Sequence, residues 1–206
     1  MKTAADSPKD SLCCKTVATE YGDLRICRRH DGFRYSVVAI HLPGEALPAG
    51  RLCHVWEEHA GNTLSSPPTS LTSLEEELRR SFEGEASKDP SLDLIDLDHC
   101  YDFQRKVLLR LRDIPRGMTV SYGTLARSIG APGAARAVGT ALARNPFPLV
   151  FPCHRVIRVS GEIGQFGGGT SMKESLLRRE GVIFSGKGVV SPRCLVAGFR
   201  GERLQD

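Results

Sequence analysis

The sequence lacks the features that mark membrane and secreted proteins. It has no run of about 18 apolar residues, the length that a helix needs to cross a bilayer, and residues 1–8 lack the apolar centre of a signal peptide. The seven cysteines are irregularly spaced, and in a reducing compartment we expect free thiols rather than a disulfide framework. The sequence thus predicts a soluble intracellular protein without a membrane partner, cytoplasmic in a prokaryote and nuclear in a eukaryote.

A phosphate-binding loop is also missing. Residues 162–169 are rich in glycine, but they do not end in the Gly-Lys-Ser/Thr of such a loop. We expect this segment to be flexible and to close one wall of a pocket.

Acidic residues are scarce in the second half of the chain. Residues 1–100 contain 11 Lys/Arg and 17 Asp/Glu, a net charge of −6, whereas residues 101–206 contain 17 and 7, a net charge of +10. A basic half is typical of proteins that bind nucleic acid, although an ordinary solvated surface can have the same composition.

The chain is long enough for two small domains. Its 206 residues, 40% of them hydrophobic, can bury one substantial core or two small ones. Residues 1–16 are expected to be loose, and residues 16–42 to form two or three antiparallel strands. The acidic stretch 85–100 is typical of a linker. We therefore predict domains at residues 1–98 and 99–206.

Apolar residues at helical spacing predict three longer helices. The first is expected to begin after Ser70 or Ser73 and to end at Gly84. The second covers about residues 103–111 and stops before a proline, and the third covers residues 171–180.

Two shorter helices, at residues 121–129 and about 133–144, are expected around a turn at 130–133, which is the pattern of a helix-turn-helix. A generic helical hairpin has the same apolar spacing. The small residues of the second helix, together with Arg136 and Arg144, favour close approach to a large, negatively charged partner.

A candidate nucleophile, Cys153, follows a segment at 147–151 that we expect to be a strand. The thiolate is the reactive form of cysteine, and a free thiol with a pKa of ~8.5 is mostly protonated at neutral pH unless cations or a base shift it. His154 and Arg155 are expected to supply that shift. The alternative is that Cys153 is a small buried apolar residue.

Five sequence blocks in the second half resemble the O6-alkylguanine-DNA alkyltransferases, in the same order and at the same spacing. The blocks are residues 120–126, 134–139, 145–148, 152–156 and 173–181. The first half resembles that family only in outline, through its strands and its helix.

The resemblance implies an α+β protein, with a ribonuclease-H-like N-terminal domain (a small antiparallel sheet plus a helix) and a helical, winged-helix-like DNA-binding domain. It implies DNA repair by direct reversal: the protein flips O6-alkylguanine, and less well O4-alkylthymine, out of duplex DNA and transfers the alkyl group irreversibly to Cys153. Such a methylated-DNA–protein-cysteine methyltransferase acts once per molecule, as a suicide enzyme. The resemblance further implies binding through the minor groove, a monomer in solution and no cofactor.

The resemblance also assigns the catalytic residues. Cys153 is the alkyl acceptor, His154 is the base that deprotonates it through a water, and Glu180 orients the histidine. Asn145 braces the turn around the site. Tyr122 crowds the target phosphate and helps to donate a proton to the departing guanine.

DNA-binding and pocket residues follow in the same way. Arg136 fills the gap left by the extruded nucleotide. The other DNA-binding residues are Tyr122, Ser121, Ala135, Gly139 and Arg144, and the pocket residues are Pro148, Val156, Phe166 and Gly167. The family often has a tyrosine and a small polar residue where this chain has Phe166 and Gly167. The width of the pocket and its preference among alkyl groups are therefore open.

Some members of the family carry a structural zinc on N-terminal cysteines and histidines. The spacings of Cys13, Cys14, Cys27 and His30 do not match a good ligand set. No metal is therefore expected.

Two other classes of function stay open. A non-catalytic alkyltransferase-like DNA sensor shares every block except the one with the cysteine, so Cys153 argues against it. A cysteine hydrolase with a Cys-His-Glu triad needs an oxyanion hole and a substrate cleft, and it leaves the basic helix-turn-helix unexplained.

Overall fold

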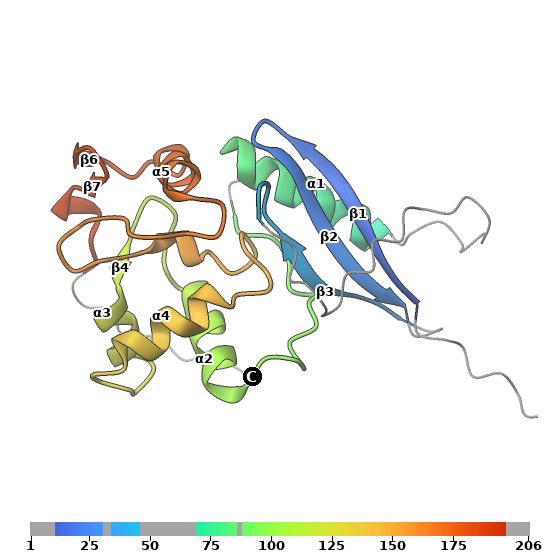
Figure 1. The fold of residues 1–206 in the computed structure, drawn as a ribbon, viewed down its shortest axis with the longest axis horizontal. Helices are drawn as coiled ribbons and strands as arrows, with labels where there is room; N and C mark the ends of the chain where they lie inside the picture. The colour runs from blue at the N-terminus through green and yellow to red at the C-terminus, as the bar shows by residue number, and fades with distance from the viewer. Residues whose placement is uncertain (1–10, 31–33, 46–68, 86–87, 197–206) are drawn as a thin grey trace, which may run out of the picture.

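The computed structural model describes residues 11–30, 34–45, 69–85 and 88–196. The first half of the chain supplies a small antiparallel sheet and one helix, and the second half supplies short helices with two-stranded pairings (Figure 1). The protein is therefore of mixed α and β structure, as predicted. In the described part of the chain, no helix is both long and apolar enough to span a bilayer.

The N-terminal sheet has three strands, in the order β1 (Ser11–Thr19), β2 (Gly22–His30) and β3 (Tyr35–His41). Both pairings are antiparallel. Gly22 begins β2 with a φ of 108°, a left-handed conformation that glycine adopts at little cost in the tight turn. The strands confirm the prediction, but the expectation of a loose start is wrong from Ser11 onward, because β1 pairs along the whole of β2.

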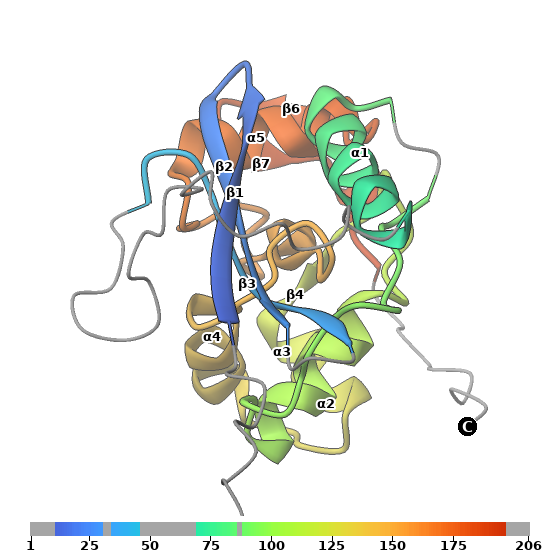
Figure 2. The same ribbon diagram turned by 90° about the vertical axis from the view of Figure 1, so that its right-hand side faces the viewer.

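The helix α1 (Thr69–Glu83) packs against this sheet (Figure 2). Its apolar stripe, Leu71, Leu74, Leu78 and Phe82, is buried, as its spacing predicts. The helix begins slightly earlier than expected and ends at the residue before Gly84, which has a φ of 78° and is typical of a helix C-terminus.

Cys14 and Cys27 face each other across β1 and β2 and are joined in a disulfide, with their Cα atoms 4.1 Å apart. The expectation that every cysteine is a free thiol is wrong for this pair. The register of the hairpin, rather than any spacing in the sequence, makes the two residues cross-strand neighbours.

The acidic stretch between the two halves is attached to the sheet. The Val37 N–H donates to the Leu94 carbonyl at 2.6 Å, and the Asp96 N–H donates to the Val37 carbonyl at 2.9 Å. The buried Asp96 carboxylate also accepts a hydrogen bond from Arg29 at 2.5 Å. This segment therefore extends the edge of the sheet beside β3 while it leads into the second half.

The second half begins with α2, and near its end a small antiparallel pairing precedes a final 3₁₀ turn. Its elements are α2 (Asp102–Leu111), β4 (Val120–Ser121), α3 (Tyr122–Ser128), α4 (Ala135–Ala143), η1 (Cys153–Arg155), β5 (Val156–Ile157), α5 (Thr170–Arg179), β6 (Phe184–Gly186), β7 (Val189–Val190) and η2 (Pro192–Cys194). The three helices α2, α3 and α4 pack together. The parallel pairing of β4 with β5 places the start of α3 beside the segment that follows Cys153.

The helices α3 and α4 confirm the expected helical hairpin. Ser121 caps α3, because its hydroxyl accepts a hydrogen bond from the Thr124 N–H at 3.1 Å. Gly133 in the intervening turn has a φ of 88°. This left-handed conformation, which glycine adopts at little cost, lets the chain change direction between α3 and α4.

The predicted strand at 147–151 is wrong. The segment is a tight turn in which the Phe151 N–H donates to the Phe147 carbonyl at 3.0 Å and Leu149 has a φ of 72°. A left-handed conformation is uncommon for a residue with a side chain. Residues 147–151 are apolar because all of them are buried. A buried turn and a buried strand have the same apolar composition, so the run does not distinguish the two.

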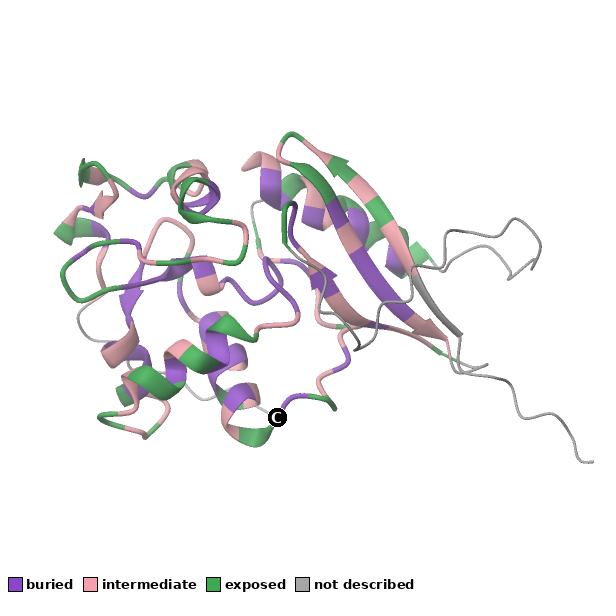
Figure 3. Ribbon diagram, viewed as in Figure 1, coloured by how far each residue is buried: buried purple, intermediate pink, exposed green. Residues whose placement is uncertain are grey.

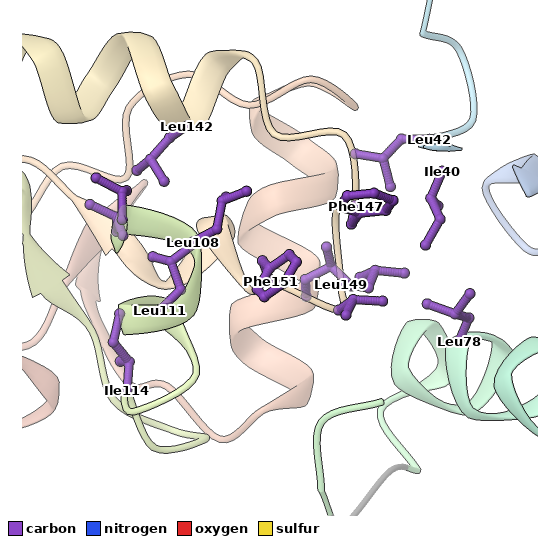
Figure 4. Close-up of a cluster of buried hydrophobic side chains, with 14 of the residues drawn as sticks. Ile40, Leu42, Leu78, Leu108, Leu111, Ile114, Leu142, Phe147, Leu149 and Phe151 are labelled. Atoms are coloured by element: carbon purple, nitrogen blue, oxygen red, sulfur yellow. The ribbon is translucent and has the colours of Figure 1, made fainter. Parts of the chain in front are cut away.

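One hydrophobic cluster joins the two halves. Phe147 and Leu149 lie between Ile40 and Leu78 on one side and Leu108, with its neighbours on α2, on the other (Figure 4). Buried stretches run through β2, β3 and α2 (Figure 3). The turn before Cys153 is therefore held from both halves of the chain.

Candidate functional site

Cys153 begins η1 and lines a pocket of about 350 Å³. The lining residues are Leu42, Glu45, Tyr122, Gly139, Leu142, Ala143, Asn145, Pro148, Cys153, Gln165, Phe166 and Gly167. Three of the four predicted pocket residues, Pro148, Phe166 and Gly167, are among them. The glycine-rich loop closes one wall of the pocket, as predicted.

Val156, the fourth predicted pocket residue, is not among the lining residues, and its place in the substrate pocket stays a prediction. It is fully buried in the core and does not contact the pocket. As the first residue of β5 it pairs with Val120, so the parallel pairing turns its side chain into the core.

Asn145 holds the turn that leads to Cys153. Its Nδ2 donates to the Phe151 carbonyl at 3.0 Å, and its Oδ1 accepts from the Phe147 N–H at 3.0 Å. Its amide also lowers the pKa of the Cys153 thiol, although the effect is smaller than that of burial. These contacts match the bracing position predicted for Asn145.

The resting Cys153 thiol is protonated rather than pre-ionised. Burial raises its pKa above the ordinary cysteine value, and the amide of Asn145 and the nearby charge of Lys173 only partly offset this effect. Although Cys153 keeps some surface exposure, dense protein around the sulfur removes most of its hydration. A base is therefore needed at the moment of reaction.

His154 has the geometry of that base. Its side chain is buried, and its Nε2 lies 3.1 Å from Oε1 of Glu180. If Nε2 carries the proton shared with the carboxylate, Nδ1 holds a lone pair, and in the described part of the chain Nδ1 has no hydrogen-bond partner. The pair thus leaves one ring nitrogen able to accept a proton.

Glu180, at the C-terminal end of α5, is kept ionised. Burial opposes its charge, but His154 and Arg155 outweigh that effect and hold the pKa of the carboxyl well below its usual range. Arg116 adds a third contact at 3.3 Å. An ionised carboxylate 3.1 Å from the ring is placed where it can stabilise an imidazolium.

Arg155 does not activate the thiol, so that expectation is wrong. Its buried guanidinium donates to both carboxylate oxygens of Glu180 at 2.8 Å, to Asp89 at 2.5 and 2.9 Å, and to the Ile114 carbonyl at 2.7 Å. The Arg155 cation therefore holds Glu180 in position. Through Asp89 it also ties the acidic stretch between the two halves to the site.

Lys173 supplies the positive charge next to Cys153 that we had expected from Arg155. It is buried on α5, its Nζ donates to the Val156 carbonyl at 2.7 Å, and burial lowers its pKa to about 8. The two-turn spacing between Lys173 and Glu180 places both on one face of the helix end. The seven-residue spacing of Lys173 and Glu180 is the signal in the sequence that indicates a shared face.

Ser121 and Tyr122 lie at the N-terminal end of α3, and only Tyr122 reaches the pocket. Tyr122 lines the pocket, and burial, followed by the nearby Cys153, raises the pKa of its phenol. The Ser121 side chain is buried and its hydroxyl is engaged in the helix cap. The predicted contact of Ser121 with DNA therefore stays a prediction, without a free hydroxyl to support it.

The helix α4 presents a small, basic surface next to the pocket. Arg136 and Arg144 are exposed, Ala135 is half-buried at the start of the helix, and Gly139 lines the pocket. A Cβ added to Gly139 would meet the Tyr122 ring at 3.9 Å, an ordinary contact distance. Of the predicted DNA-binding residues of α4, Gly139 lies at the pocket while Arg136 and Arg144 are exposed near the two ends of the helix, and their contacts with DNA stay predictions.

Two residues of the site carried no signal in the sequence. Glu45 follows β3, and Asp89 lies in the acidic stretch, so neither belongs to a periodic element or a recognised block. Only the packing of the two halves places them beside the pocket and the Arg155–Glu180 pair.

The structure offers no evidence for a metal centre in the residues that it describes. There, no group of three or more His, Cys, Asp or Glu side chains is placed to hold a metal ion. Of the candidate ligands, Cys14 and Cys27 are bonded to each other.

The second half of the chain matches a known protein family. Residues 102–182 match the 6-O-methylguanine DNA methyltransferase, DNA binding domain. This segment contains Tyr122, Arg136, Cys153 and Glu180. It begins with α2 and ends just after α5.

Named relatives extend the match into the first half. The methylated-DNA–protein-cysteine methyltransferase of Methanothermobacter thermautotrophicus is 42% identical over 123 residues, 60% of this chain and 68% of that protein. The Mycobacterium bovis protein of the same name is 45% identical over 138 residues, 66% of this chain and 81% of its own length.

Solved structures agree with these relatives. The O6-methylguanine methyltransferase of Mycobacterium tuberculosis superposes with a TM-score of 0.64 at 33% identity, covering 82% of this chain and 93% of that one. The OGT of the same organism, solved in complex with DNA, has a TM-score of 0.61 at 33% identity, covering 80% and 90%. The chain belongs to the methylated-DNA–protein-cysteine methyltransferase family.

Proposed function

We propose that this protein repairs O6-alkylguanine, and less well O4-alkylthymine, in duplex DNA by flipping the base out and transferring its alkyl group irreversibly to Cys153. The observation that carries the proposal is the position of Cys153 in a pocket next to the buried His154–Glu180 pair, whose side chains are 3.1 Å apart. Membership of the family, and a similar structure solved in complex with DNA, support the substrate.

The proposed reaction begins with a proton transfer. His154 accepts the thiol proton at Nδ1 through a water, and ionised Glu180 stabilises the imidazolium. The Cys153 sulfur then attacks the alkyl carbon in line, the bond from that carbon to guanine O6 breaks, and its electron pair leaves with the base. Tyr122 helps to donate a proton to the departing guanine. The thioether has no leaving route, so each molecule reacts once, and no cofactor is required.

On the DNA side, we propose that α4 enters the minor groove. Its small residues, Ala135 and Gly139, permit close approach of the backbone, and exposed Arg136 fills the space vacated by the flipped nucleotide. Arg144 contacts phosphate. We further propose that the protein acts as a monomer inside the cell.

We also propose a finer description of the fold. The three-stranded sheet with α1 supports a ribonuclease-H-like N-terminal domain at residues 1–98. The helical hairpin followed by the β6–β7 pairing supports a winged-helix-like domain at residues 99–206.

The proposal is tested by the stoichiometry of the reaction. When the protein is mixed with excess duplex containing O6-methylguanine, intact-mass analysis is expected to show the gain of one methyl group, located on the peptide that contains Cys153. Product is expected to plateau at one equivalent. Continued turnover would instead indicate a hydrolase or another true catalyst, and binding without any mass gain would indicate a DNA sensor.

A substitution of Arg136 distinguishes a residue that fills the vacated base stack from one that only contacts phosphate. Arg136→Ala is expected to slow repair of O6-methylguanine in duplex DNA by at least about tenfold, because flipping costs a few kcal/mol when the gap in the stack is left open. Repair of a single strand or of the free modified base is expected to change far less, since there is no gap to fill. The measurement is the single-turnover rate on each of the three substrates.

Arg144→Ala is the matched control, because it removes the same charge from the other end of α4. It is expected to weaken binding to any duplex and to reduce the log-log salt slope by about one, as for the loss of a phosphate contact. Equal losses on all three substrates for Arg136→Ala would instead show that Arg136 supports the fold or the pocket.

A further inference from the structure

Glu45 belongs to the pocket although it comes from the first half of the chain. It follows β3 in a tight turn, in which the Glu45 N–H donates to the Leu42 carbonyl at 3.1 Å. Its Oε2 accepts a hydrogen bond from the Leu42 N–H, also at 3.1 Å. The end of β3 is itself tied to the active-site turn, because the Ile40 N–H donates to the Pro146 carbonyl at 2.7 Å. The carboxylate is therefore held in place rather than free to swing.

The other carboxylate oxygen of Glu45 faces the glycine-rich loop. A Cβ added to Gly167 would lie 3.2 Å from Oε1 of Glu45, closer than an ordinary van der Waals contact. Gly167 contributes no side chain to this wall, so an acidic group from the first half of the chain takes the adjoining space.

Glu45 brings a negative charge into an otherwise uncharged lining. Among the lining residues that the structure describes, it is the sole acidic or basic side chain. The nearby cation, Lys173, is buried and donates to the Val156 carbonyl. The field of Glu45 reaches the nucleophile, since it contributes, as a smaller effect than burial, to raising the pKa of Cys153.

We infer that Glu45 makes the pocket selective by charge, so that neutral O6-alkyl groups such as methyl are accepted and groups that carry a carboxylate, such as carboxymethyl, are disfavoured. The inference rests on the proposed function. Glu45 is exposed in the free protein, where water screens its charge, but a flipped base displaces water from the pocket and strengthens repulsion between two carboxylates inside it. A methyl group meets no such repulsion.

The test compares two substrates on the full chain. Single-turnover rates are measured on matched duplexes that contain O6-methylguanine or O6-carboxymethylguanine, for the wild type and for Glu45→Gln. Glutamine keeps the size of the side chain and an oxygen to accept from the Leu42 N–H. The ratio of the methyl rate to the carboxymethyl rate is expected to fall at least about tenfold in the variant, equivalent to ~1.4 kcal/mol.

The ratio cancels general effects on DNA affinity, because the two duplexes carry the same phosphates. Glu76→Gln is the matched control: it removes the same charge from the exposed face of α1, and its ratio is expected to equal that of the wild type. Glu45→Lys is a second variant, expected to lower the ratio further by attracting the carboxylate.

The outcomes separate the inference from the proposed function. If the wild type transfers methyl but the ratio is unchanged in both Glu45 variants, the inference alone is overturned. If Glu76→Gln lowers the ratio as much as Glu45→Gln, the effect is one of net charge and the inference is likewise overturned. A wild type that transfers neither group overturns the proposed function, and the inference with it.

Discussion

Cys153→Ala is expected to abolish alkyl transfer completely while the protein still binds DNA that contains O6-methylguanine. The substitution removes the only atom of the site that can form the thioether, but little volume from a residue that lines the pocket. The measurements are the mass of the protein after incubation with the modified duplex and fluorescence anisotropy of a labelled duplex.

Cys100 and Cys194 provide the matched controls, because both are free thiols but buried away from the pocket lining. Cys100→Ala and Cys194→Ala are expected to retain transfer to one equivalent, with at most a moderate loss of stability from the lost core volume. Methyl transfer that persists in Cys153→Ala and disappears in either control would place the acceptor elsewhere.

Glu180→Gln is expected to slow methyl transfer at neutral pH by about 10²–10⁴-fold. The wild-type carboxylate is ionised because His154 and Arg155 outweigh the opposing effect of burial and hold its pKa below the usual range. A neutral amide cannot stabilise an imidazolium in the same way, and its NH₂ group can hold the ring in the wrong tautomer. Single-turnover kinetics with O6-methylguanine duplex measure the effect.

The pH dependence of this variant reveals why the rate falls. Burial raises the pKa of Cys153, so the unassisted thiol is protonated at neutral pH and ionises only as the pH rises beyond the ordinary cysteine value of about 8.5. The rate of Glu180→Gln is therefore expected to increase with pH and to recover part of the loss. A deficit that is the same at every pH would show that Glu180 does not act through ionisation of the thiol.

Asp89→Asn distinguishes activation from stability. Asp89 and Glu180 hold the same guanidinium of Arg155, but only Glu180 contacts His154. Both variants are expected to lower the melting temperature, because each weakens a buried ion pair. The asparagine variant is expected to keep a nearly wild-type rate at temperatures where it is folded. Parallel losses of rate in the two variants would contradict the orienting role of Glu180.

Local signals in the sequence predicted the elements that carry the site. The apolar stripe from Leu71 to Phe82 and the small residues of α4 lie where their spacing predicts, because helical periodicity reports which face is buried whatever packs against it. Ser121 caps α3 by accepting a hydrogen bond from the Thr124 N–H, so a local contact fixes where this helix begins. The resemblance of five blocks supplied the family and the candidates Cys153, His154 and Glu180.

The sequence pattern gave wrong predictions where one pattern is compatible with two structures. The apolar run at 147–151 is buried on all sides, so it has no alternation to distinguish a strand from a turn. Arg155 follows His154 in the sequence, but its guanidinium points to Glu180 and Asp89 rather than to the thiol. Adjacency in the sequence does not fix the direction of a long side chain.

The sequence by itself determined the helices, since periodicity and caps depend on neighbours within a few turns of chain, and its resemblance to a family supplied Cys153 as the candidate nucleophile. Only the tertiary structure decided which distant residues meet at the pocket. Glu45 reaches it because β3 is tied to Pro146, and Asp89 reaches Arg155 because the inter-half segment folds back onto the site. Contacts of this kind depend on how the two halves pack around one shared hydrophobic core. Periodic patterns report local structure and do not predict that packing.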